Sequence, residues 1–175
     1  ISEAAVDSDV VFLAVPVGMI ADVGSKISEK MKKGAILTDT GSVKGSVLKD
    51  LKKIVPPGVN LIPAHPVAGT EHSGPDAGFA ELFLNRWCIL TPSENADSKA
   101  IEKLVAFWEG VGCRVEIMDT AHHDLVLAVT SHLPHLIAYN IVGTAEDLEM
   151  VTKSEVIKFA AGGFRDFTRI ASSNP

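Results

Sequence analysis

The sequence has little cysteine, no excess of basic charge and no long apolar run. Its two cysteines, Cys88 and Cys113, lie in separate apolar stretches without a CxxC motif, so we expect reduced, structural residues. The formal net charge of −6 argues against a nucleic-acid partner, because such proteins usually present a basic face. The sequence contains no uninterrupted apolar run of about 20 residues, the length that would predict a membrane span. No basic segment followed by an apolar one opens the chain, which favours a cytoplasmic protein.

The sequence also lacks the glycine-rich turn with which a dinucleotide-binding fold opens. Such a fold normally begins with a strand, a GxGxxG turn and an acidic residue about 20 positions later. The first strand-like run here resembles a later strand of such a sheet, and the chain stops at the polar segment Ser172–Pro175. We therefore expect a chain that is truncated at both ends.

Strand-like and helical segments alternate over the first part of the chain. Three strands are expected, at Val10–Val15, Ala35–Asp39 and Val59–Ala64. Short connections rich in Gly and Pro predict parallel pairing with right-handed crossovers. The first strand is apolar throughout, which is typical of a central strand covered on both faces. Two further strands, Arg86–Thr91 and Cys113–Met118, flank a predicted helix at Ser98–Gly110 and should extend the same sheet.

From Asp119 onward the pattern is helical. Asp119 or Thr120 can cap a long apolar helix. Pro134 interrupts this helix, and because an interior proline costs about 3 kcal/mol, we expect a kink or break near Thr130 and Ser131. The predicted fold class is α/β, with a Rossmann-like, mostly parallel sheet that lacks its first βαβ unit (residues 1–118). An all-α helical domain follows it (residues 119–175).

The strand that ends at Ala64 delivers a histidine to the edge of the predicted sheet. Ligands of open α/β sheets collect outside the carboxyl ends of the strands, and histidine exchanges protons near neutral pH. Pro66 favours an extended conformation for His65, which helps to fix its ring. Position alone leaves open a histidine that only caps a loop. His122, His123 and His72 carry no comparable signal.

Ser42 follows the neighbouring strand and is expected to lie close to His65. A hydroxyl there can hold one ring nitrogen and set the tautomer that faces a substrate. The alternative is that Thr40 or Ser42 only caps the next helix, and the two roles are compatible.

Two groups in the helical part can also serve a site. His132 and His135 lie on one helix face, and because no HExxH pattern or third ligand is near, they favour a cavity lining or satisfied core histidines over a metal site. Arg169 lies one turn from Asp166 among apolar neighbours, which predicts partial burial. A guanidinium there can anchor an anionic substrate, or Asp166 can simply satisfy it.

Five stretches in this order resemble the prephenate/arogenate (cyclohexadienyl) dehydrogenase family of tyrosine biosynthesis. They are VVFLAVP from Val10, DTGSVK from Asp39, HPVAGTEHSG from His65, SHLPH from Ser131 and GGFRDFTRIA from Gly162. The resemblance covers the chain from Asp9 onward. It implies an oxidative decarboxylation in which hydride passes to NAD or NADP, and a homodimer in the full-length protein.

The resemblance also implies roles for individual residues. His65 would take the proton of the ring hydroxyl, and Ser42 would orient His65 and touch the nicotinamide. The implied substrate residues are His132, His135, Arg169, Asp166, Thr70 and Glu71. The implied cofactor groove is lined by Val15, Pro16, Thr40, Gly41 and Ser42.

Three matters stay open at this point. The sequence does not distinguish prephenate from arogenate, and the choice between NAD and NADP depends on an acidic or basic residue of the absent first segment. Other dehydrogenases of this architecture, such as 3-hydroxyacid dehydrogenases and pyrroline-carboxylate reductases, share the AVP that follows the first strand. A non-catalytic fragment is a further alternative, because the pyrophosphate-binding turn is missing.

Overall fold

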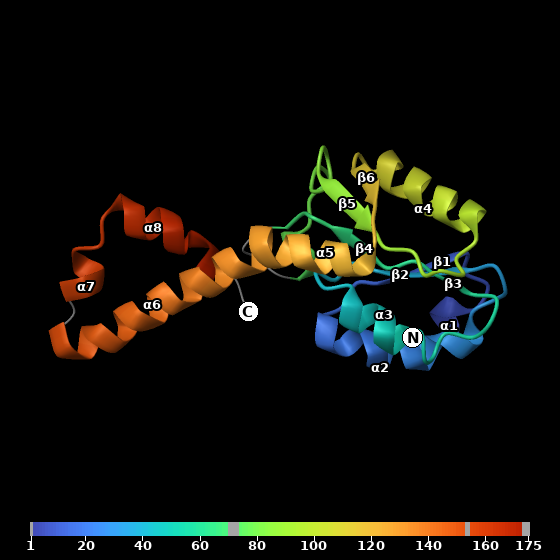
Figure 1. Ribbon diagram of the computed structural model, residues 1–175, viewed down its shortest axis with the longest axis horizontal. Coiled ribbons are helices and arrows are strands. Elements are labelled where there is room, and N and C mark those ends of the chain that lie inside the picture. Colours follow the sequence, from blue (N-terminus) through green and yellow to red (C-terminus); the bar gives the residue numbers. More distant parts are fainter. Residues whose placement is uncertain (1, 70–73, 153–154, 173–175) are drawn as a thin grey trace. The chain divides into compact units, whose positions relative to one another are not determined.

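The computed structural model describes residues 2–69, 74–152 and 155–172 and divides the chain into two compact units (Figure 1). Unit 1 comprises Ile1–Ala68 and Ala80–Leu125. Unit 2 comprises Gly69–Phe79 and Val126–Pro175.

A parallel three-stranded sheet in unit 1 has the order β1-β2-β3. Its strands are β1 (Val10–Leu13), β2 (Ile36–Asp39) and β3 (Asn60–Leu61). β2 is fully buried, whereas β1 forms an edge and three of its four residues are only partly buried. The prediction of a central first strand is therefore wrong for the described residues, in which β1 pairs with β2 alone.

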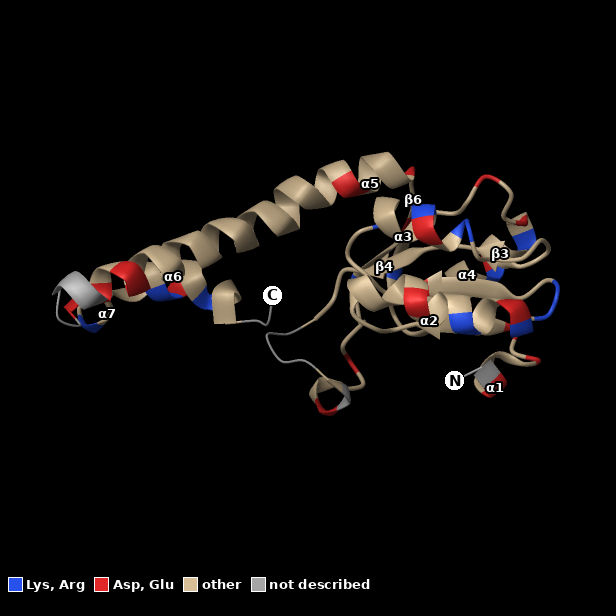
Figure 2. Cartoon of the chain, turned by 90° about the horizontal axis from the view of Figure 1, so that it is seen from below, with Lys and Arg blue, Asp and Glu red and all other residues tan. Residues whose placement is uncertain are grey.

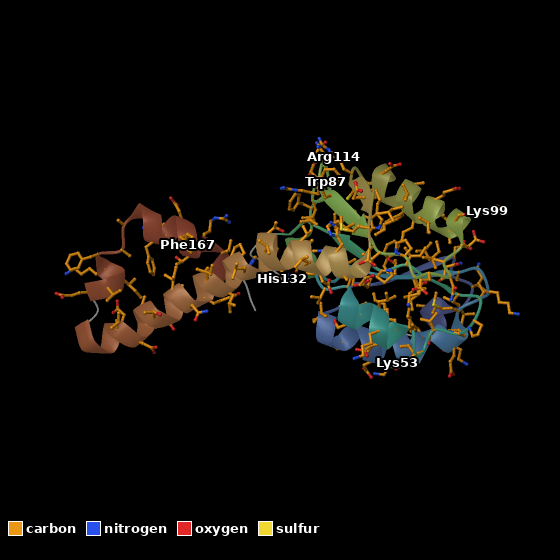
Figure 3. The ribbon with its side chains drawn as sticks, viewed as in Figure 1. Lys53, Trp87, Lys99, Arg114, His132 and Phe167 are labelled. Carbon is orange, nitrogen blue, oxygen red and sulfur yellow. The ribbon has the colours of Figure 1, made fainter. Side chains whose placement is uncertain are left out.

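A second three-stranded sheet has the order β4-β5-β6. Its strands are β4 (Ala64–Pro66), β5 (Trp87–Leu90) and β6 (Arg114–Ile117). β4 is antiparallel to β5, and β5 is parallel to β6. Trp87 and Arg114 pair across this sheet, with the guanidinium carbon 6.0 Å from the ring centroid (Figure 3).

The predicted single sheet is thus two sheets, and the break falls after Pro63. The backbone ladder to β2 stops there because the next N–H in line, that of Ala64, donates to the Asp39 carboxylate (3.2 Å) instead of to a carbonyl of β2. The N–H of Ile62 still donates to Leu37 of β2 (3.0 Å), and the N–H of Thr91 donates to the Pro63 carbonyl (2.9 Å). Residues between β3 and β4 therefore join the two sheets, and His65 lies inside β4 instead of after a strand.

Helices cover both faces of the sheets in unit 1 (Figure 1). They are α1 (Ser2–Ala5), α2 (Ile20–Ile27), α3 (Gly45–Leu51), α4 (Ser98–Gly110) and α5 (Thr120–Leu127), with 3₁₀ turns at Val17–Met19 and Ser28–Lys30. Leu37 and Leu51 belong to the core cluster beneath α2 and α3, and Leu104 belongs to the cluster beneath α4. Both cysteines are free and buried, as the sequence predicted.

Unit 2 is helical within its described residues. Its elements are a 3₁₀ turn (Pro75–Ala77), a π-helical segment (Ala128–His132), α6 (Leu133–Thr152), α7 (Glu155–Lys158), α8 (Gly162–Thr168) and a 3₁₀ turn (Arg169–Ser172). The predicted kink or break near Thr130 and Ser131 is not a break, because the helix continues past Pro134, but a π-helical segment lies at that place. The cap is confirmed, because the Asp119 carboxylate accepts hydrogen bonds from the N–H groups of Ala121 (2.8 Å) and His122 (3.1 Å).

The helical stretch Thr120–Glu149 is long and apolar enough to cross a membrane, and 11% of its most apolar window is buried. No such stretch was expected from the sequence, because it has no uninterrupted apolar run of about 20 residues. Figure 2 shows that α6 carries no charged side chain until its acidic last turns. Length and composition do not distinguish a membrane span from a helix that other protein covers.

Candidate active site

A buried ion pair fixes the turn that follows β2. The Asp39 carboxylate pairs with the Lys44 ammonium, and both side chains are fully buried. Asp39 also accepts hydrogen bonds from the N–H groups of Gly41 (2.8 Å) and Ala64 (3.2 Å), while Lys44 donates to the Ala64 carbonyl (2.7 Å). Burial raises the pKa of Asp39 and lowers the pKa of Lys44, and their mutual attraction opposes both shifts. The pair ties residues 39–44 to the start of β4.

His65 follows Ala64 in β4 and is 7% exposed. Its Nδ1 atom lies 2.9 Å from Nε2 of His123, a residue of α5 that is fully buried. The two rings meet edge to face, with centroids 5.1 Å apart and planes at 69°. The Nδ1 atom of His123 lies 2.8 Å from Oδ1 of Asp124. The three side chains therefore form a continuous line of hydrogen bonds within unit 1.

The Asp124 carboxylate also accepts hydrogen bonds from the N-cap residue and the first residue of α3. The N–H groups of Lys44 and Gly45 donate to its Oδ1 and Oδ2 atoms, each at 2.8 Å. Burial disfavours the charged form of Asp124, but the N–H of Lys44, the His123 ring and the N–H of Gly45 together lower its pKa below the ordinary value. An ionised carboxylate therefore ends the line.

The cofactor-groove residues predicted from the sequence follow β1 and β2. Leu13 of β1 is in register with Asp39 of β2, so Val15 and Pro16 lie at the same sheet edge as residues 40–42. Pro16 and Ser42 are exposed there. An apolar surface with one hydroxyl suits the ring and amide of a nicotinamide. The individual contacts to a cofactor stay predictions.

Two family models match the chain over almost its whole length. The nucleotide-binding domain of prephenate dehydrogenase matches residues 2–117, and the dimerization domain of prephenate dehydrogenase matches residues 119–175. The chain belongs to the prephenate dehydrogenase family. This confirms the resemblance that the five sequence stretches indicated.

Relatives in this family are similar over the whole chain. The cyclohexadienyl dehydrogenase of Zymomonas mobilis is 45% identical over 175 residues, which cover 100% of this chain and 59% of that protein. The crystal structure of Aquifex aeolicus prephenate dehydrogenase in complex with hydroxyphenyl propionate and NAD+ has a TM-score of 0.86 and 38% identity, covering 95% of this chain and 57% of that one. Synechocystis arogenate dehydrogenase has a TM-score of 0.77 and 28% identity, covering 97% of this chain and 60% of that one.

These likenesses confirm the predicted fold class, a Rossmann-like sheet followed by a helical domain. The chain spans about three fifths of the length of the relatives that it matches most fully. The Aquifex aeolicus structure contains NAD+, which agrees with the predicted cofactor class.

Three members of this site were not predicted from the sequence. No signal was assigned to His123, which is wrong, because His123 is the residue that meets the His65 ring. Asp124 and Lys44 carried no prediction of their own. Only the structure shows which histidine faces inward: His123 and Leu127, four residues apart, are both buried and mark the inner face of α5.

The other predicted substrate residues lie in unit 2. Nδ1 of His135 lies 2.9 Å from the carbonyl oxygen of Ser131, so Nδ1 donates and Nε2 is the acceptor of the neutral ring. Nε2 of His132 is buried and makes no hydrogen bond within the described part of the chain. Thr70 and Glu71 lie outside the described residues. Across residues 2–69, 74–152 and 155–172, no three His, Cys, Asp or Glu side chains form a group that could hold a metal ion.

Arg169 and Asp166 are exposed in unit 2, so the predicted partial burial of Arg169 is wrong. The short helix α8 and the 3₁₀ turn that follows it do not cover their own apolar residues, and Phe167 is 51% exposed (Figure 3). The apolar residues next to Arg169 in the sequence therefore did not indicate that its side chain is buried. The role of Arg169 in substrate binding stays a prediction.

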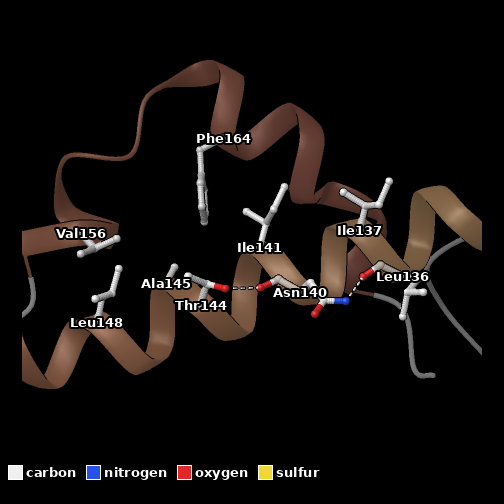
Figure 4. A pocket seen from close by; sticks show the side chains of 9 residues that line it. All are labelled: Leu136, Ile137, Asn140, Ile141, Thr144, Ala145, Leu148, Val156 and Phe164. Atoms are coloured by element: carbon white, nitrogen blue, oxygen red, sulfur yellow. Dashed lines mark hydrogen bonds between the residues drawn. The ribbon is translucent and has the colours of Figure 1, made fainter.

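An apolar groove of about 490 Å³ runs between α6, α7 and α8 of unit 2 (Figure 4). Phe164 of α8 points toward α6 across this groove. Its lining is Leu136, Ile137, Asn140, Ile141, Thr144, Ala145, Leu148, Val156 and Phe164. An exposed apolar groove in a region that matches a dimerization domain is consistent with a protein interface.

Proposed function

We propose that the protein to which this chain belongs is an NAD(P)-dependent dehydrogenase of tyrosine biosynthesis that decarboxylates prephenate, arogenate or both oxidatively. The observation that carries this proposal is His65, a buried histidine of a nucleotide-binding domain whose Nδ1 atom is engaged by a second histidine. Such a ring is oriented by the protein and can exchange a proton through its other nitrogen.

The proposed reaction requires a base beside the substrate hydroxyl. Nε2 of His65 takes the hydroxyl proton while the carbon that bears this hydroxyl gives up a hydride. The ring carboxylate then leaves as carbon dioxide, and the electron pair of the broken bond completes the aromatic ring. A positioned general base contributes roughly 10² to 10⁴ in rate.

A nicotinamide cofactor would accept the hydride in this reaction. Residues Val15, Pro16, Thr40 and Gly41 would line its groove, and Ser42 would contact its nicotinamide end and help to orient His65. The exposed hydroxyl of Ser42 and the shared sheet edge of the two segments support this assignment. Both NAD and NADP are compatible with these residues.

The proposed substrate contacts come from unit 2 and from the segment around Thr70 and Glu71. Arg169 would bind a substrate carboxylate with two parallel hydrogen bonds, and Asp166 would brace it. His132 and His135 would line the substrate cavity. The buried Nε2 of His132 and the acceptor Nε2 of His135 support this role, because both can bond a polar ligand.

The domain organisation and partners are part of the same proposal. Residues 1–118 would form the incomplete nucleotide-binding domain, and residues 119–175 would begin the helical domain, in agreement with the two matched families. The apolar groove of unit 2 would be covered in a homodimer instead of by lipid. The protein would act in the cytoplasm on small molecules, without a nucleic-acid or membrane partner, as metabolic enzymes of this kind do.

Steady-state assays of the complete protein test the proposal. Prephenate and arogenate are each combined with NAD and NADP, and reduced cofactor, carbon dioxide and the aromatic product are measured together. A 3-hydroxyacid and a pyrroline carboxylate serve as controls for the rival dehydrogenases of this architecture. Equal formation of the three products with prephenate or arogenate supports the proposal, and turnover of the control substrates alone contradicts it.

A further inference from the structure

Two residues without a role in the sequence analysis stand behind the proposed base. We propose that His123 and Asp124 are positioning residues that fix His65 in the tautomer with its proton on Nδ1, leaving the lone pair on Nε2 for the substrate. This inference rests on the proposed function for the role of His65. Its structural part, the direction of the hydrogen bonds, is independent of the reaction.

The direction of the line follows from its acidic end. An ionised carboxylate can only accept hydrogen bonds, and Asp124 already accepts from the N–H groups of Lys44 and Gly45. The Nδ1 atom of His123, 2.8 Å away, must therefore be a donor, and in the neutral ring its Nε2 atom is then an acceptor. The Nδ1 atom of His65, 2.9 Å from that acceptor, must then carry its own proton. In the neutral line, both His65 and His123 therefore carry their ring proton on Nδ1.

The same line also favours the charged product of the proton transfer. When His65 gains a second proton on Nε2, its positive charge is matched by the negative charge of Asp124 through the neutral ring of His123. His123 is fully buried and His65 nearly so, and hydrogen bonds in such surroundings are stronger than in water. The line therefore sets both the tautomer and the basicity of His65.

A purely structural role is the competing explanation, because the line also ties β4 to α5 and α3. Asp124→Asn separates the two roles, since it keeps the size of the side chain but replaces one acceptor oxygen by a donor. With the amide oxygen on the N–H of Gly45, the amide donates to His123. His123 then donates from Nε2 to His65, and His65 carries its proton on Nε2, where it cannot act as a base. In serine proteases a change of this kind leaves the geometry intact and lowers kcat about 10⁴-fold.

Two substitutions of His123 provide a test by rescue. His123→Gln places an amide oxygen near the position of Nε2, so His65 can still donate from Nδ1. His123→Phe removes the acceptor but keeps a buried ring. His122→Gln is the matched control, because His122 is the exposed neighbour on α5.

The experiment is ¹⁵N NMR of labelled histidines in the complete protein, combined with kcat and KM for the same variants. We expect the His65 proton on Nδ1 in the wild type and on Nε2 in Asp124→Asn. We expect kcat to fall roughly 10² to 10⁴-fold in Asp124→Asn with little change in KM, and His123→Gln to retain far more kcat than His123→Phe. His122→Gln should match the wild type.

The outcomes separate this inference from the proposed function. A His65 proton on Nε2 in the wild type overturns the inference, and so does an Asp124→Asn variant with unchanged tautomer and unchanged kcat. Equal losses of kcat in His123→Gln and His123→Phe also overturn it in favour of a structural tie. A wild type that turns over neither prephenate nor arogenate contradicts the proposed function, while the NMR result still decides the direction of the hydrogen bonds.

Discussion

The Nδ1 atom of His65 and the Nε2 atom of His123 lie 2.9 Å apart although the two residues are 58 positions apart in the sequence. Both belong to unit 1, where β4 supplies one ring and α5 the other. The contact shows that a tertiary partner orients His65, in addition to the backbone restriction that Pro66 imposes.

Gly45→Ala should disturb the site without changing any residue of the hydrogen-bonded line. A Cβ atom at position 45 would lie 2.7 Å from Oδ2 of Asp124, so the carboxylate must move. We expect kcat to fall, as it is expected to fall in Asp124→Asn. Stability should change by less than about 1 kcal/mol, because alanine is favoured over glycine in a helix by a similar amount. Kinetics and urea unfolding measure the two effects, with Gly110→Ala as the control at an unobstructed helical glycine. Unchanged kcat in Gly45→Ala would contradict the account.

Lys44→Met should destabilise unit 1 strongly. It leaves the buried Asp39 carboxylate without its cation, and breaking a buried pair in this way costs about 3 to 5 kcal/mol. The double variant Asp39→Leu/Lys44→Met removes both charges and should be more stable than Lys44→Met alone. Urea unfolding at neutral pH measures both. A loss below about 1 kcal/mol for Lys44→Met would show that the pair is not needed to hold the turn.

The stabilising effect of Asp124 should depend on pH in one direction. Its pKa in the folded protein lies below the ordinary value of 3.8, so its contribution is complete above that value and is lost as the pH falls through the folded pKa. The difference in stability between wild type and Asp124→Asn should therefore be constant at neutral pH and shrink in acid. Urea unfolding as a function of pH measures this difference. A difference that persists or grows in acid would contradict the assignment of Asp124 as an ionised acceptor.

Arg169→Gln should mainly raise the KM of the substrate, because Arg169 is proposed to bind a substrate carboxylate. The substitution removes the charge but keeps a polar side chain of similar length. Arg165→Gln, at an exposed arginine of α8, is the control. Steady-state kinetics of the complete protein measure both variants. A KM that is equal to that of the wild type would remove Arg169 from the substrate site.

Much of the fold could be predicted because it depends on local patterns. The bounds of α4 agree with the predicted Ser98–Gly110, where a clear apolar spacing follows the cap Asp97. The division into two sheets at Pro63 could not be predicted in the same way. It depends on which backbone groups find partners, and Ala64 finds the side chain of Asp39. Local spacing contains no information about such a contact.

The candidate site also depends on tertiary contacts that local sequence patterns do not predict. His65 could be singled out as a candidate because it follows an apolar run and precedes a proline. His123 could not be assigned a role, because its partner is distant in the sequence and an adjacent His122 offers an equivalent ring. Only the packing of α5 against the sheet decides which of the two histidines is buried.

Turnover by His65→Asn in the complete protein tests the central claim most directly. Asparagine keeps a polar group at the site but cannot accept a proton near neutral pH. We expect kcat with prephenate or arogenate to fall roughly 10² to 10⁴-fold, while KM changes little. A His65→Asn variant with the kcat of the wild type would contradict the assignment of His65 as the base.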